Sequence, residues 1–119
     1  MRTIFVYGLL KPGFTYHGLA APFVVDTEPA HVSGRLFDAG VPAARFDQTG
    51  TITGYVYWLH EDRVDEALTA FDDLEDEGEH YRRVRVTAHT PTGAVEAYAY
   101  EYLLDLSGAR YVGECWPRS

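Results

Sequence analysis

The chain has 119 residues, of which 46% are hydrophobic and 14% are aromatic, and this length and composition predict a single globular domain over residues 1–119. Its formal net charge of −8 argues against a nucleic-acid partner, because phosphate binding depends on clustered lysine and arginine. The sequence has no apolar run of membrane-spanning length and no secretory signal at its start, so we expect no membrane partner and a cytoplasmic location.

The first half of the chain carries three strand patterns. Residues 3–7 are β-branched and aromatic and lead into Gly8 and a turn at residues 11–13, which predicts a strand followed by a loop. Residues 31–38 alternate in polarity, and residues 53–59 are rich in aromatic and β-branched side chains. We therefore predict strands over both segments.

One segment predicts a helix. Apolar residues recur at i, i+3, i+4 and i+7, the spacing of an amphipathic helix, at Val64, Ala67, Leu68 and Phe71. Asp62 precedes this series and is the expected N-cap.

The second half predicts a hairpin, because residues 81–89 and 94–103 alternate in polarity on either side of a turn at residues 91–93. On its second strand, three tyrosines share one face, which we expect to be a packed or exposed strand surface: Tyr98, Tyr100 and Tyr102. The tail, residues 106–119, is predicted to be irregular. One helix with five or more strands predicts an α+β fold, and a closed or nearly closed sheet would protect the strand edges.

Glu75 stands out among the acids. Ten of the eighteen lie between Glu61 and Glu79, and a solvated helix face explains most of them. If the helix continues, eleven steps of about 100° bring Glu75 to within about 20° of Val64, on the apolar stripe. A carboxylate buried there would have a raised pKa, as a general acid or base requires. If the helix ends near Asp72, Glu75 is an ordinary surface acid, and helical phase leaves both interpretations open.

The loop after the first strand is a second candidate feature. Gly8 lets the backbone approach a ligand closely, and the amides that follow can form an anion-binding nest. A plain turn is the other interpretation. The single cysteine, Cys115, cannot form an internal disulfide and is a weak nucleophile candidate, and the five histidines lack metal-site spacing, so we expect no metal.

Six short motifs, in this order and spacing, are similar to those of the γ-glutamyl cyclotransferase family, especially its γ-glutamylamine, AIG2-like branch. They are Tyr7-Gly8-Leu9-Leu10-Lys11-Pro12-Gly13, Gly34-Arg35-Leu36-Phe37, Gly54-Tyr55-Val56-Tyr57, Phe71-Asp72-Asp73-Leu74-Glu75, Tyr81-Arg82-Arg83 and Gly113-Glu114-Cys115-Trp116.

The resemblance implies a small mixed β-barrel with one main flanking helix, and a catalytic glutamate at Glu75. It also implies that the N-terminal loop, with Tyr7, Gly8, Leu9 and Leu10, grips the α-amino and α-carboxylate end of a γ-glutamyl group. The substrate's own α-amine would attack its γ-carbonyl and release 5-oxoproline and a free amine, with no cofactor. Tyr81 is expected to bind the substrate or orient Glu75, or else to be a core aromatic.

Two further points qualify the resemblance. The family commonly has serine or threonine where this chain has Leu9, so a hydroxyl contact is lost. Lys11 either attracts the substrate carboxylate or is a solvated loop lysine. The alternative function is a non-catalytic small-molecule binding module of the same fold, and a purely structural domain would have no deep pocket behind Tyr7. The leaving amine and the oligomeric state stay open.

Overall fold

The computed structural model describes residues 1–117. Its strands, in chain order, are β1 (Thr3–Val6), β2 (Val24–Ser33), β3 (Arg35–Asp38), β4 (Pro42–Arg45), β5 (Thr51–Leu59), β6 (Tyr81–Thr90), β7 (Gly93–Tyr102) and β8 (Arg110–Gly113). Its α-helices are α1 (His17–Ala20) and α2 (Val64–Glu75), and single 3₁₀ turns lie at Ala21–Phe23 and Glu61–Arg63.

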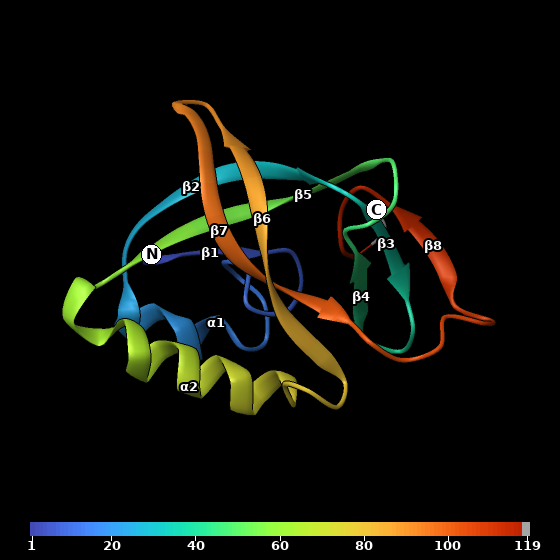
Figure 1. The fold of residues 1–119 in the computed structure, drawn as a ribbon, viewed down its shortest axis with the longest axis horizontal. Coiled ribbons are helices and arrows are strands. Elements are labelled where there is room, and N and C mark those ends of the chain that lie inside the picture. Colours follow the sequence, from blue (N-terminus) through green and yellow to red (C-terminus); the bar gives the residue numbers. More distant parts are fainter. Residues whose placement is uncertain (118–119) are drawn as a thin grey trace.

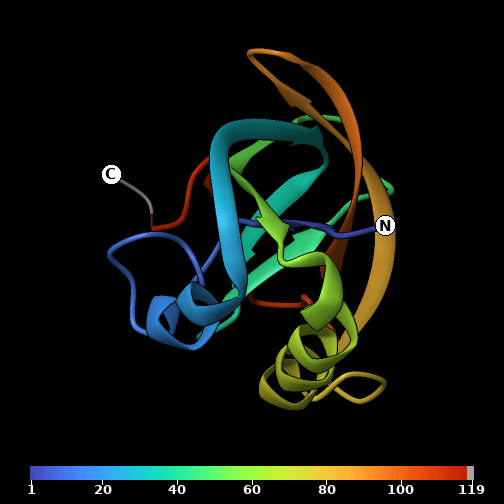
Figure 2. The same ribbon diagram turned by 90° about the vertical axis from the view of Figure 1, so that its left-hand side faces the viewer.

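Five strands close into a barrel in the order β1-β5-β2-β6-β7, and β4, β3 and β8 form a separate small sheet. The barrel is mixed, because β1 pairs antiparallel with β5 and parallel with β7, where Ile4 lies opposite Tyr98. Helix α2 runs along one side of the barrel with α1 beside it, while the small sheet lies at one end (Figures 1 and 2). The predicted small mixed barrel with one main flanking helix is confirmed.

The core consists of two clusters. One takes residues from all five barrel strands and therefore fills the barrel, and its alanines keep this narrow interior from being overfilled: Phe5, Ala30, Val32, Ile52, Val56, Ala88, Ala97 and Ala99. The other lies between the barrel and helix α2, where Phe71 and Leu68 pack with Tyr57 and Tyr100. Strand β7 is thus covered on both faces, so its tyrosine face is packed rather than exposed.

The segment predicted as one strand over residues 31–38 is two strands in two different sheets. Gly34 separates β2 from β3 with φ 152°, in the region that favours glycine. A Cβ at this position would lie 2.6 Å from the carbonyl oxygen of Arg45. The alternation of Val32 and Leu36 continues across the break because both side chains are buried in the barrel cluster.

Three other expectations need correction. The tail predicted to be irregular contains β8, which pairs with β3 and places Tyr111 opposite Phe37; residues 118 and 119 of that tail lie outside the described part. Strand β4 and the first half of β2 were not predicted. Asp62 is not the N-cap, since it lies in the 3₁₀ turn that precedes α2, and the N-cap residue, Arg63, makes no capping bond through its side chain.

Helix α2 continues as far as Glu75. It ends at Asp76, which adopts a left-handed conformation with φ 52° and ψ 55°. The N–H of Glu77 then donates to the carbonyl of Asp72 at 2.9 Å, the bond that commonly closes a helix with a left-handed residue at its end. This termination keeps Glu75 in the last helical turn and starts the loop that leads to β6.

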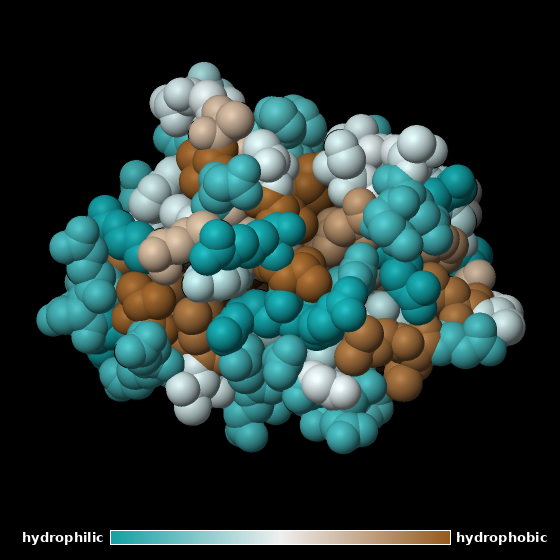
Figure 3. Space-filling model, in the orientation of Figure 1, coloured by the Kyte–Doolittle hydropathy of each residue, from teal (hydrophilic) through white to brown (hydrophobic). Residues whose placement is uncertain are grey.

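The outer surface is largely hydrophilic on the face shown in Figure 3, and hydrophobic residues appear between polar ones. The acids that flank Glu75 in sequence contribute to such a surface, because Asp73 and Asp76 are exposed. Within residues 1–117, the structure contains no helix with the length and apolar character that a membrane crossing requires.

Candidate active site

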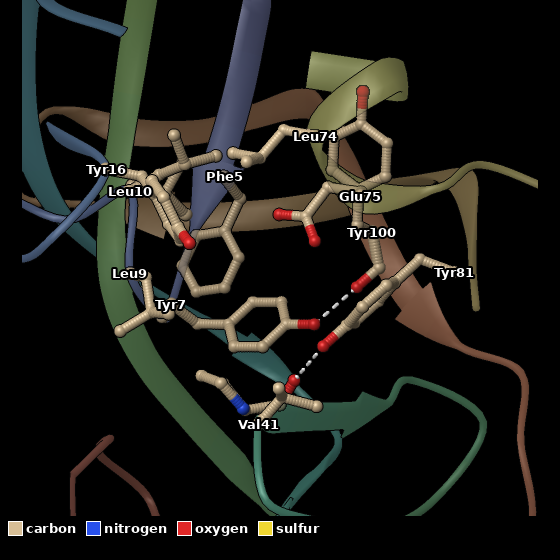
Figure 4. Close-up of a pocket in the computed structure, with 13 residues that line it drawn as sticks. Phe5, Tyr7, Leu9, Leu10, Tyr16, Val41, Leu74, Glu75, Tyr81 and Tyr100 are labelled. Carbon is tan, nitrogen blue, oxygen red and sulfur yellow. Dashed lines mark hydrogen bonds between the residues drawn. The ribbon is translucent and has the colours of Figure 1, made fainter. Parts of the chain in front are cut away.

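A cavity of about 230 Å³ lies where β1 and its following loop meet the end of α2. The beginnings of β4 and β6 and the end of β7 complete its wall (Figure 4). All six residues predicted for the site line this cavity, together with seven others; the full set is Phe5, Val6, Tyr7, Gly8, Leu9, Leu10, Tyr16, Val41, Pro42, Leu74, Glu75, Tyr81 and Tyr100. A pocket behind Tyr7 is not what a purely structural domain predicts.

Glu75 points its carboxylate into the cavity (Figure 4). Burial raises the pKa of this carboxyl group from its ordinary value to about 7. No hydrogen bond or ion pair between the described residues involves the carboxylate of Glu75, whereas buried carboxylates of structural importance are normally paired. Near neutral pH such a group exchanges a proton readily in either direction, as a general acid or base does.

Asp72, one turn before Glu75, holds the last turn of α2 against the barrel through hydrogen bonds. The hydroxyl of Tyr100 donates to Asp72 Oδ1 at 2.6 Å, and Arg83 Nη1 donates to Asp72 Oδ2 at 2.7 Å. Because Tyr100 belongs to β7 and Arg83 to β6, both strands hold the helix end at once. The position of the Glu75 carboxylate therefore depends on this three-residue cluster.

Two tyrosines form the deep side of the cavity, and each donates its hydroxyl to a backbone carbonyl. Tyr7 donates to the carbonyl of Tyr100, and Tyr81 donates to the carbonyl of Pro42, both at 2.6 Å. Burial raises the pKa of both phenols above the ordinary value, so both stay protonated. Tyr81 makes no hydrogen bond to Glu75, and its oxygen is left as an acceptor for any group that enters the cavity.

The loop after β1 lines the cavity and has backbone N–H groups without a protein acceptor. The carbonyls of Gly8, Leu9 and Leu10 accept bonds from Lys11 N, Tyr16 N and the Tyr57 hydroxyl, respectively. The N–H groups of these three loop residues donate to no protein acceptor among residues 1–117, so they are free to bind an anion. The absence of a side chain at Gly8 lets this loop pack closely against Pro42, because a Cβ there would lie 2.8 Å from Pro42 Cγ.

Lys11 lies outside the cavity. Its side chain is buried, and its ammonium group donates to the carbonyl of Trp116 and lies 3.7 Å from Cys115 Sγ. It lines a separate groove of about 710 Å³ that shares no residue with the first cavity. Lys11 is therefore not a solvated loop lysine, and in this position it does not reach a ligand beside Glu75.

Several residues of the cavity wall were not predicted. Tyr100 was assigned to a strand surface, although its ring packs beside Glu75 while its carbonyl accepts from Tyr7 (Figure 4). Tyr16 and Val41 come from loops, which have no periodicity to reveal them, and Pro42 begins β4, a strand that was not predicted. Within the described part of the chain, no group of three or more histidine, cysteine, aspartate or glutamate side chains is placed to hold a metal ion.

The family model described as "Gamma-glutamyl cyclotransferase, AIG2-like" matches residues 4–118. Among solved structures, an AIG2-like protein from Mus musculus has a TM-score of 0.71 at 23% identity, over 85% of this chain and 76% of that one. The protein ytfP from Escherichia coli has a TM-score of 0.64 at 24% identity, over 97% and 96% of the two chains.

The structure of YkqA from Bacillus subtilis has a TM-score of 0.71 at 27% identity and covers 96% of this chain. This chain spans 39% of YkqA, so the relative is much longer. These likenesses show that the barrel, the small sheet and the flanking helix recur in other proteins. A search of curated proteins found no match to this sequence.

Proposed function

We propose that this chain, which belongs to the gamma-glutamyl cyclotransferase, AIG2-like family, cleaves a γ-glutamyl amide into 5-oxoproline and a free amine. The observation that carries the proposal is Glu75, a partly buried carboxylate with a pKa of about 7 and no protein partner, facing a small cavity. A site with one proton-exchanging group and no protein nucleophile suits a reaction in which the substrate attacks itself.

The reaction begins with proton transfer from the substrate's α-ammonium to the carboxylate of Glu75. The freed amine then attacks the γ-carbonyl carbon, which closes a five-membered ring and places negative charge on the carbonyl oxygen. When the intermediate collapses, the bond from this carbon to the amide nitrogen breaks. The ring nitrogen loses a second proton. The departing amine receives both this proton and the first one, which Glu75 delivers.

Two physical effects support this scheme. The attack is intramolecular, and well-oriented intramolecular reactions reach effective molarities of about 10⁵–10⁸ M, so positioning supplies much of the rate. The free N–H groups of Gly8, Leu9 and Leu10 are suited to bind either the α-carboxylate or the developing oxyanion. The cavity is smaller than the roughly 300–1,000 Å³ of typical ligand pockets, which fits a ligand part as small as a glutamyl group.

The test is to incubate the protein with a panel of γ-glutamyl amides and to measure 5-oxoproline. Wild type is compared with Glu75→Gln, which keeps the shape of the side chain but cannot exchange a proton, and with Asp73→Asn, an exposed acid in the same turn, as control. We expect product from wild type and from Asp73→Asn, and a loss of at least about 100-fold in the rate of product formation in Glu75→Gln, the lower end for a general acid or base.

Full activity in Glu75→Gln would refute the role of Glu75. Binding without product from any amide would indicate a non-catalytic binding module.

A further inference from the structure

A second groove, of about 710 Å³, shares no residue with the cavity beside Glu75. Part of its lining comes from three adjacent barrel strands, β5, β2 and β6, and the rest comes from the loop after β1, the turn after β6 and the segment after β8. Thr53 of β5 donates from its N–H and its hydroxyl to the carbonyl of Glu114, so the segment after β8 is held against the strands. The groove is therefore a separate hollow that is built from distant parts of the chain.

Lys11 is buried at this groove without a counter-ion. Its side chain is in a residue that is only 4% exposed, and its ammonium group bonds to neutral groups: the carbonyl of Trp116, Cys115 Sγ at 3.7 Å, and the ring of Phe14, whose centroid lies 4.6 Å away. Lys11 and these three partners all line the groove. Within residues 1–117, no acidic side chain forms an ion pair with Lys11. Burial of a charge without an opposite charge costs free energy, and an anion in the groove would supply that opposite charge.

Two histidines offer further hydrogen-bond donors to the groove. His31 of β2 lies opposite Thr53 of β5 and opposite His89 of β6, so three polar side chains form a row across three strands. The rings of His31 and His89 are exposed and stack with their centroids 5.1 Å apart. Neither ring bonds to another residue of the described part, and an imidazole has an N–H donor in both its neutral and its charged form. The groove therefore has donors for an anion besides Lys11.

The lining of the groove has no acid and is rich in rings. The chain has eighteen acidic residues, yet none of the described residues that line this groove is acidic, and the sequence neighbours Glu28 and Glu114 are not part of it. Phe14, Tyr55 and Trp116 supply aromatic surface. Four prolines add rigid apolar contacts: Pro12, Pro29, Pro91 and Pro117. Such a surface favours a planar ring as the uncharged part of a ligand.

We propose that this groove is a second ligand site, and that it binds a small aromatic anion: a carboxylate or a phosphate monoester attached to a planar ring. The anionic group supplies the counter-ion that Lys11 lacks, and the ring packs on the aromatic residues. The volume of the groove lies within the roughly 300–1,000 Å³ of typical ligand pockets. This inference goes beyond the proposed function, because it uses neither Glu75 nor the cavity that Glu75 faces.

The test compares two series of probes by isothermal titration calorimetry. In the carboxylate series, indole-3-propionate is compared with indole-3-propionamide, which lacks the charge, and with propionate, which lacks the ring. In the phosphate series, 1-naphthyl phosphate is compared with 1-naphthol and with inorganic phosphate. In at least one series, we expect the aromatic anion to bind at least about tenfold more tightly than both of its controls, which corresponds to about 1.4 kcal/mol. That series identifies the anion, and the absence of such a preference in both series would overturn the inference.

Variants test where the anion binds. Lys11→Met removes the charge, and the double variant His31→Gln, His89→Gln removes two exposed imidazoles that the fold does not need to bury. We expect each to weaken binding of the aromatic anion by about tenfold. His60→Gln, an exposed histidine outside the groove, and Glu75→Gln should leave the dissociation constant unchanged. If Lys11→Met does not fold, the double histidine variant decides, and wild-type affinity in the folded groove variants would overturn the inference.

Cys115 gives an independent readout, because it is the only cysteine, is exposed and lines the groove. A ligand in the groove covers this thiol, so alkylation of Cys115 by iodoacetamide should slow in proportion to occupancy by the aromatic anion. An unchanged alkylation rate at saturating ligand would place the ligand elsewhere and overturn the inference. Both readouts measure binding alone, so their failure leaves the proposed function standing, and the absence of 5-oxoproline formation leaves this inference standing.

Discussion

Asp72 and Glu75 lie one turn apart at the end of helix α2, and their carboxylates have opposite surroundings. Asp72 accepts hydrogen bonds from Tyr100 and Arg83, whereas Glu75 accepts none from the described residues. One acid thus holds the helix end in place, and the other is held in the cavity without a partner. The cost of burying Glu75 without a partner is consistent with a functional role.

Asp72→Asn tests the positioning role of Asp72. The amide keeps one acceptor but loses the charge that pairs with Arg83, so we expect a loss of stability of about 1–2 kcal/mol. A looser helix end lets water reach Glu75, so its pKa should fall and the acidic limb of the kcat/KM profile should move to lower pH. Asp73→Asn is the control. An unshifted limb with lower stability would mean that Asp72 is only structural.

The pH dependence of activity tests the state of Glu75. The carboxylate form must accept the first proton, so kcat/KM should rise with pH and level off above an apparent pKa of about 7. The measurement is the initial rate of 5-oxoproline formation from γ-glutamyl-n-butylamide between pH 5 and 9. A profile that is already flat at pH 5.5 would contradict the raised pKa of Glu75.

The stability of Glu75→Gln should depend on pH in a specific direction. Because the folded-state pKa lies above the ordinary value, the folded protein binds this proton more tightly than the unfolded chain does. Ionised Glu75 therefore destabilises the fold, increasingly as pH rises through about 7. We expect Glu75→Gln to gain on the order of 2 kcal/mol at pH 8, at about 1.4 kcal/mol per pKa unit and allowing for partial exposure, and little at pH 5. Urea unfolding at both pH values checks this, and an equal gain at both would indicate an effect unrelated to ionisation.

Gly54→Ala tests the close contact between β1 and β5. A Cβ at Gly54 would overlap the carbonyl oxygen of Val6, the last residue of β1 before the loop that lines the cavity. We expect a loss of about 3 kcal/mol or more, or failure to fold, because backbone cannot move aside as a flexible side chain can. Gly18→Ala is the control, since nothing lies within 4 Å of its Cβ position in α1, and it should be neutral or gain up to about 1 kcal/mol. Comparable unfolding midpoints for the two variants would argue against the contact.

Local patterns predicted the elements whose signal lies within one segment. The apolar series from Val64 to Phe71 predicted α2, and its phase placed Glu75 on the buried side if the helix continued. Whether it continued depended on Asp76, a residue other than glycine in a left-handed conformation, for which the sequence carries no strong signal. Family resemblance, rather than helical phase, favoured Glu75.

Features that depend on distant pairing were missed. Strand β8 lies in a glycine-rich tail and forms only because β3 offers it an edge. Gly34 interrupts an alternation that looks continuous, because the break depends on the carbonyl of Arg45 across the small sheet. The place of Tyr100 in the cavity wall is not predictable, because periodicity shows which face a residue shares but not whether that face meets a cavity or a packed helix. The burial of Lys11 is not predictable from its own segment, because its partner, Trp116, is 105 residues away in the sequence.

The parallel pairing of β1 with β7 also sets the order of events when the protein is made. The cavity wall uses Phe5 to Leu10 and Tyr100, so it cannot exist until the hairpin of β6 and β7 has left the ribosome. At about 5–20 residues per second, Ile4 can pair with β5 earlier but waits roughly 5–20 s for its partner on β7. Such distant pairing also slows folding itself. During synthesis, the candidate site is thus among the last parts of the molecule to form.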